Sequence, residues 1–89
     1  METLWVDFNN MGRDGVRLIC HGTLKEIEQK SIKLYNGLQL LLWYSDEYND
    51  GTIDKLTAVA LVKYSDIDKC WVGQFDPDDL KLESQKPKE

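Results

Sequence analysis

The chain has 89 residues with an ordinary globular composition: 42% are hydrophobic, 16 are acidic and 11 are basic, for a net charge of -5. This length predicts one small domain, and the acidic balance disfavours nucleic acid as a partner, because contacts to phosphates supply most of the affinity in such complexes. The longest apolar runs, such as Leu40 to Tyr44, are far below the roughly 20 residues of a membrane helix, so no membrane partner is expected. We expect a single domain over residues 1–80 and a disordered charged tail at 81–89.

The two cysteines, Cys20 and Cys70, are too few and too far apart for the disulfide framework of a small secreted domain. The first ten residues lack the basic and apolar regions of a signal peptide. The sequence therefore favours a cytoplasmic protein with reduced thiols.

Alternating apolar and polar residues predict a strand at 4–8 and another at 16–20. The loop between them is rich in turn residues, which favours a β-hairpin. In that hairpin Asp7 would face solvent or pair with Arg17 on the neighbouring strand.

A short helix is expected after the second strand. Thr23 stands three residues before Glu26, the spacing of a capping box, and good helix formers follow. These residues predict about two turns of helix near residues 24–31, with one apolar stripe against the sheet.

Three more strands are predicted at 38–44, 56–64 and 70–75, and Asp76 with Pro77 would begin one helical turn. Five short strands and one helix predict an all-β fold. We expect a small antiparallel barrel, SH3-like or OB-like, because closure removes exposed sheet edges. An open sheet with the helix on one face is the alternative.

An acidic stretch at residues 45–54 follows the third strand. It does not fit a calcium-binding EF-hand loop: with Gly51 at the sixth position, Tyr48 falls at the third and Thr57 at the twelfth, where a glutamate is needed. We interpret the stretch as a solvated hairpin turn, and we expect neither a metal nor another cofactor.

Cys20, His21 and Cys70 are the candidates for metal binding or nucleophilic catalysis. Zinc sites use four ligands with paired short spacings, and adjacent strand residues such as Cys20 and His21 point to opposite faces. The sequence also lacks the phosphate-binding and hydrolase motifs. We therefore expect no enzymatic activity; a small-ligand or catalytic site that uses His21 and Cys70 is the alternative.

The tryptophans form either a second small core under the helix or an exposed aromatic patch that binds a partner. Together with the acidic turn they make up the candidate interaction surface: Trp43, Asp46, Glu47, Tyr48, Asp50, Trp5 and Trp71. The function we expect is a non-catalytic protein-interaction module whose partner is another protein. A weaker alternative is an acidic nucleic-acid mimic that binds a basic protein.

Four stretches of the chain resemble a family of short bacterial proteins with the same order of elements and a similarly acidic loop. They are LWVDFNN (4–10), RL-x-C-x-GTL (17–24), the turn at 34–37 and KCWV (69–72). The likeness extends to about Asp79 and departs at Trp43-Tyr44, where the family carries more charge. It implies a small bacterial cytosolic domain and no particular activity or site residue.

Overall fold

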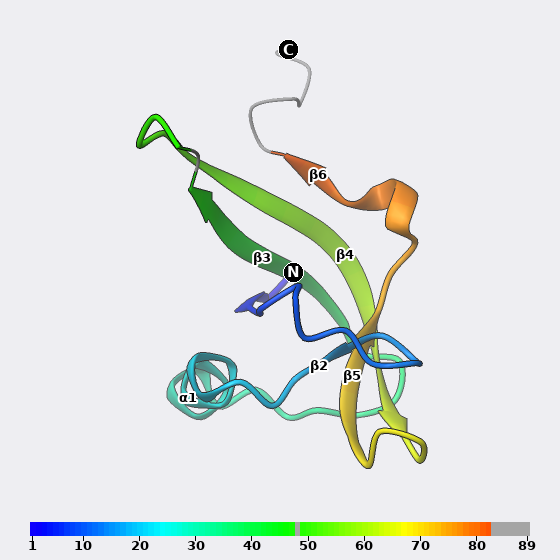
Figure 1. Cartoon of the computed structure of the whole chain (residues 1–89). Helices are drawn as coiled ribbons and strands as arrows, with labels where there is room; N and C mark the ends of the chain where they lie inside the picture. The colour runs from blue at the N-terminus through cyan, green and yellow to red at the C-terminus, as the bar shows by residue number, and fades with distance from the viewer. Residues whose placement is uncertain (48, 83–89) are drawn as a thin grey trace.

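The computed structural model describes residues 1–47 and 49–82, with one α-helix, α1 (His21–Lys30), and one 3-10 turn, η1 (Pro77–Asp79) (Figure 1). Its strands are β1 (Thr3–Trp5), β2 (Val16–Arg17), β3 (Gln39–Glu47), β4 (Ile53–Ser65), β5 (Cys70–Gln74) and β6 (Lys81–Leu82). The prediction of a mostly β protein with one short helix is confirmed.

The strands form one curled sheet in the order β1-β3-β4-β5-β2, and β6 pairs with β4 beside this path. β1 runs parallel to β3, and the remaining pairs are antiparallel. Within the part of the chain that the structure describes, the sheet has six strands rather than five and stays open, because β1 and β2 do not pair with each other. The expected closure into a barrel is therefore not seen.

β1 and β2 do not form the predicted hairpin. Instead, β1 pairs with β3 and β2 pairs with β5. The parallel register sets Leu4 beside Leu42, and both side chains are fully buried, which a local hairpin would not achieve. The predicted Asp7–Arg17 pair is consequently not formed: the Asp7 carboxylate accepts from the Asn9 amide at 2.9 Å, and the Arg17 guanidinium donates to a backbone carbonyl at 3.2 Å.

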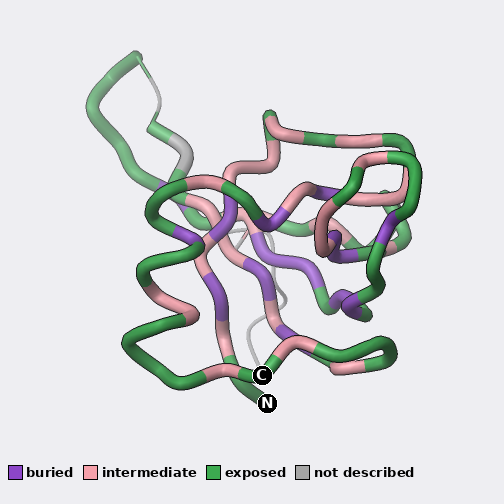
Figure 2. Tube along the Cα trace, turned by 90° about the horizontal axis from the view of Figure 1, so that it is seen from below, coloured by how far each residue is buried: buried purple, intermediate pink, exposed green. Residues whose placement is uncertain are grey.

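One face of the sheet, the core face, carries the main buried cluster. Burying each large aliphatic side chain contributes about 1.5–3 kcal/mol. Figure 2 shows the buried segments gathered in the middle of the strands, with the end of the β3–β4 hairpin exposed. The cluster consists of Leu4, Val6, Val16, Leu18, Leu40, Leu42, Ala60 and Val62.

The helix begins earlier than predicted, at His21. Cys20 is its N-cap residue and provides no side-chain cap. The capping box is not formed, because the Thr23 hydroxyl donates to the Trp5 carbonyl at 2.8 Å instead. Among the described residues, no helix has the length and apolar character needed to cross a membrane.

The chain turns after β5 as the sequence predicts. The Asp76 carboxylate accepts from the Asp78 amide at 3.0 Å, with Pro77 as the first residue of η1. Lys81 and Leu82, the first residues of the expected tail, form β6. The rest of that tail, residues 83–89, lies outside the described residues.

Candidate functional site

A row of neighbouring side chains crosses the sheet on the face opposite the core, which we call the outer face. The pairing register joins Trp5 to Trp43, Trp43 to Thr57 and Thr57 to Lys81 across β1, β3, β4 and β6. Directly paired residues point to the same side of a sheet. Two indoles, a hydroxyl and an ammonium group therefore line one row.

Helix α1 lies beside β1 rather than over this face (Figure 1). Its side chains bond to backbone groups on the open edge of that strand. The Trp5 amide donates to Glu26 Oε2 at 3.0 Å, and the Trp5 carbonyl accepts from Thr23 Oγ1 at 2.8 Å. Lys30 Nζ donates to the Thr3 carbonyl at 2.9 Å. An open strand edge is a site for unwanted pairing, so these bonds both protect the edge and fix the helix.

The helix and the tryptophans line an open hollow of about 580 Å³ on the surface. A Cβ atom at Gly22 would lie 3.0 Å from the Trp5 ring, so the glycine lets helix and indole approach closely. The residues of α1 that line the hollow are spaced by three or four positions, so they occupy one side of the helix. The lining residues are Trp5, Gly22, Lys25, Glu26, Gln29, Lys30 and Trp43.

Two further hollows, of about 350 and 300 Å³, continue across the outer face. The first of these shares Trp43 with the hollow beside α1, and the second shares Leu41 and Thr57 with the first. We call the three together the outer groove. It runs from α1 to η1, and its additional lining residues are Thr3, Leu41, Lys55, Thr57, Ala58, Val59, Asp79 and Lys81.

Lys30 is committed to the structure of the groove wall. Its ammonium group lies 2.6 Å from Glu26 Oε1 and 3.6 Å from Glu2 Oε1. The hydrogen bond to Glu26 raises the pKa of Lys30 above its usual value of 10.5, and the charges of Glu26 and Glu2 act in the same direction, against partial desolvation. Because the Lys30 side chain is 34% exposed, each ion pair contributes about 0–1 kcal/mol.

The other groove lysines are differently placed. Lys55 Nζ lies 5.1 Å from the centroid of the Trp43 ring, a cation–π contact. Within residues 1–47 and 49–82, Lys25, Lys55 and Lys81 form no salt bridge. This groove is therefore locally basic on a chain whose net charge is -5.

The structure separates the tryptophans of the predicted interaction surface. Trp5 and Trp43 are half-buried neighbours on the outer face. Trp71 packs against the core cluster and meets Tyr64 edge-on, with ring centroids 5.5 Å apart. Trp71 is paired with Tyr64, which shares one face of β4 with the buried core residues Ala60 and Val62. Trp71 therefore lies on the core face.

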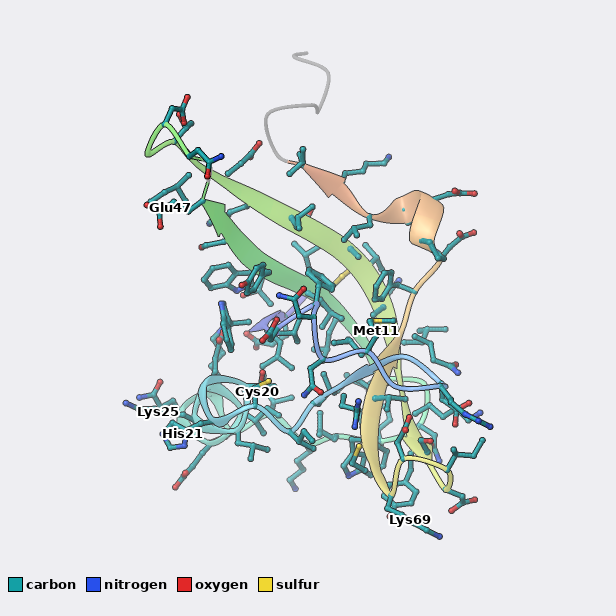
Figure 3. All side chains as sticks on the ribbon, in the orientation of Figure 1. Met11, Cys20, His21, Lys25, Glu47 and Lys69 are labelled. Carbon is teal, nitrogen blue, oxygen red and sulfur yellow. The ribbon has the colours of Figure 1, made fainter. Side chains whose placement is uncertain are left out.

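The acidic residues of that predicted surface lie along the arm formed by β3 and β4. Asp46 is in β3, in register with Asp54, and exposed Glu47 ends the strand (Figure 3). The Asp50 carboxylate accepts from the Thr52 amide at 2.9 Å, and bonding to Thr52 lowers the pKa of Asp50. The stretch is a hairpin turn, as interpreted from the sequence; Tyr48 lies outside the described residues.

Cys20 and Cys70 are free, half-buried thiols. Burial raises the pKa of Cys70 above its usual value of 9.0, and the charge of Asp68 adds to this, opposed by Arg17. Figure 3 places His21 at the start of α1 and Lys69, the residue before Cys70, at another corner of the molecule. No hydrogen bond between His21 and Cys70 is found among the described residues, which also contain no group of three residues suited to hold a metal ion.

Sequence reasoning missed the lysines of the outer groove. Lys25, Lys55 and Lys81 come from a helix and two strands that meet only through the sheet register. Alternation along β4 indicates that Lys55 and Thr57 share a face, but not which strands flank them.

No family model, curated protein or solved structure matches the chain.

Proposed function

We propose that this protein is a small, non-catalytic interaction module that binds a partner protein through the outer groove. The observation that carries the proposal is the row Trp5–Trp43–Thr57–Lys81, in which two half-exposed indoles form the floor of a groove walled by α1. Tryptophan, like tyrosine and arginine, is enriched among the side chains that dominate binding energy at protein interfaces.

Further apolar surface continues from the groove along β4. Val59 is 41% exposed and Leu61 51% exposed, and both share the outer face with the groove because they are odd-numbered residues of β4, like Thr57. Apolar side chains gathered on one face and rimmed by charges are typical of a protein-binding surface.

A cytoplasmic location is part of the proposal and is supported by the two free thiols, which persist in reducing compartments. The alternative that uses His21 and Cys70 has less support, because no hydrogen bond or ion pair joins the two side chains within residues 1–47 and 49–82. The nucleic-acid-mimic alternative has less support, because the groove lining contains four lysines, Lys25, Lys30, Lys55 and Lys81, against two acids, Glu26 and Asp79.

Photo-crosslinking from the groove tests the proposal. The variant Val59→p-benzoylphenylalanine places a photoreactive group in the lining of the groove, and Ile67→p-benzoylphenylalanine places it in the exposed turn between β4 and β5. On irradiation in host cells, we expect one discrete protein adduct from position 59 and none from position 67. No adduct at position 59, or the same adducts at both positions, would contradict the proposal.

A further inference from the structure

We infer that the outer groove binds an extended acidic segment of the partner protein. An apolar side chain of that segment would lie against Trp5 and Trp43, and its carboxylates would lie beside Lys25 and Lys55. The inference rests on the proposed function and adds the chemistry of the partner.

The distribution of charge in the groove points to an acidic ligand. Both carboxylate oxygens of Glu26 have partners within the protein: one pairs with the Lys30 ammonium and the other accepts a hydrogen bond from the Trp5 amide. The remaining acid, Asp79, lies at the η1 end of the groove. Lys25 and Lys55 have no carboxylate partner among the described residues, so a bound carboxylate would complete their pairing without breaking an existing ion pair.

The environment of Trp43 favours a peptide over a nucleic acid. The Lys55 ammonium lies 5.1 Å from the centroid of this indole, so a peptide can pair a carboxylate with the ammonium while a neighbouring apolar side chain contacts the rest of the ring. A long polyanion such as a nucleic acid would also be repelled by the chain's net charge of -5. A short acidic peptide needs only the local charges within about one Debye length, roughly 8–10 Å.

The dimensions of the row set the length of the segment. Adjacent strands lie about 4.8 Å apart, so the row from Trp5 to Lys81 spans roughly 14 Å across four strands. An extended peptide advances about 3.4 Å per residue, so about four residues cover the row and about eight reach past both ends. A second copy of this chain is a competing acidic ligand, through the exposed Glu47 and Ile53 of its β3–β4 arm. The measurement of self-association described below distinguishes it from a partner protein.

The experiment selects binders for the full chain from a bead-bound library of random octapeptides. We expect the enriched peptides to carry two or more carboxylates around one aromatic or large aliphatic residue. Enrichment of neutral or basic peptides would overturn the inference, and so would the absence of any enrichment.

Variants then locate the site. Lys25→Gln and Lys55→Gln are each expected to weaken an enriched peptide roughly twofold to fivefold and to reduce the salt dependence of binding. Lys63→Gln, an exposed lysine on the same face of β4 but outside the groove lining, is the matched control and should leave affinity unchanged. Equal losses in the control and the groove variants would overturn the inference.

Competition separates the other ligands. If oligothymidylate displaces the peptide at a lower concentration than an acidic peptide does, the ligand is a nucleic acid instead of the inferred partner. If the chain self-associates with rising concentration and Lys55→Gln removes this association, the ligand is a second copy of the chain. An adduct at position 59 together with non-acidic selected peptides would reject the acidic partner and leave the proposed function standing. Failure of both experiments would reject both.

Discussion

Replacing Thr23 by valine tests how the helix is fixed to the edge of the sheet. Thr23 is fully buried, and its hydroxyl donates to the Trp5 carbonyl at 2.8 Å. Thr23→Val keeps the side-chain volume but removes this donor, so the Trp5 carbonyl loses its hydrogen bond to the side chain. Loss of a buried hydrogen bond with one partner left unsatisfied costs about 1–2 kcal/mol. For a domain of this size, that loss lowers Tm by roughly 4–16 °C.

Urea unfolding followed by circular dichroism measures the change. The matched control is Thr57→Val, since Thr57 is also buried, at 8% exposed, and its hydroxyl makes no hydrogen bond within the described chain. We expect this control to change the unfolding free energy by less than about 0.5 kcal/mol. Equal stabilities for Thr23→Val and wild type would refute the role given to this bond.

Three further outcomes are expected. The pKa of Lys30 is raised in the folded state, so the stabilisation by the protonated side chain is present below pH 10.5 and is lost as pH rises through the folded pKa. In thermal unfolding above pH 10.5, the Tm of the wild type should therefore fall more steeply than that of Lys30→Met. The difference in unfolding free energy should be at most about 1 kcal/mol after solvent screening. A Cβ at Gly15, where φ is 151°, would lie 2.5 Å from the Gly73 carbonyl oxygen, so Gly15→Ala should destabilise the fold by more than Gly37→Ala, where φ is 96° but no atom lies within 4 Å; equal chemical-denaturation midpoints would contradict this. Burial and the charge of Asp68 raise the pKa of Cys70, so iodoacetamide should modify this thiol at pH 8 more slowly in the folded protein than in urea, as read by mass spectrometry; equal rates would count against the buried position.

Local sequence patterns predicted much of the secondary structure and little of the pairing. Two-residue alternation identified the long β3–β4 hairpin, and turn residues identified its loop. The same reasoning paired residues 4–8 with 16–20 because they are close in sequence. The observed parallel pairing of β1 with β3 joins segments almost forty residues apart, and it is favoured by the burial of Leu4 beside Leu42, which no local pattern encodes.

The helix start and the groove lysines were missed for related reasons. A threonine before a helix predicts a cap when only neighbouring residues are considered, but Thr23 bonds instead to Trp5 on a distant strand. A shift of one residue in register reverses the face of a side chain, so the sequence could not tell that Trp71 faces away from Trp5 and Trp43. The groove lysines become neighbours only when the sheet is assembled.

The tryptophan indole resonances give the most direct test of the outer groove as the binding site. In a titration of the ¹⁵N-labelled full chain with an enriched acidic octapeptide, the account predicts that the Nε1–H signals of Trp5 and Trp43 shift. The Trp71 signal, from the opposite face, should stay in place. A shift at Trp71 with Trp5 and Trp43 unchanged would contradict the account.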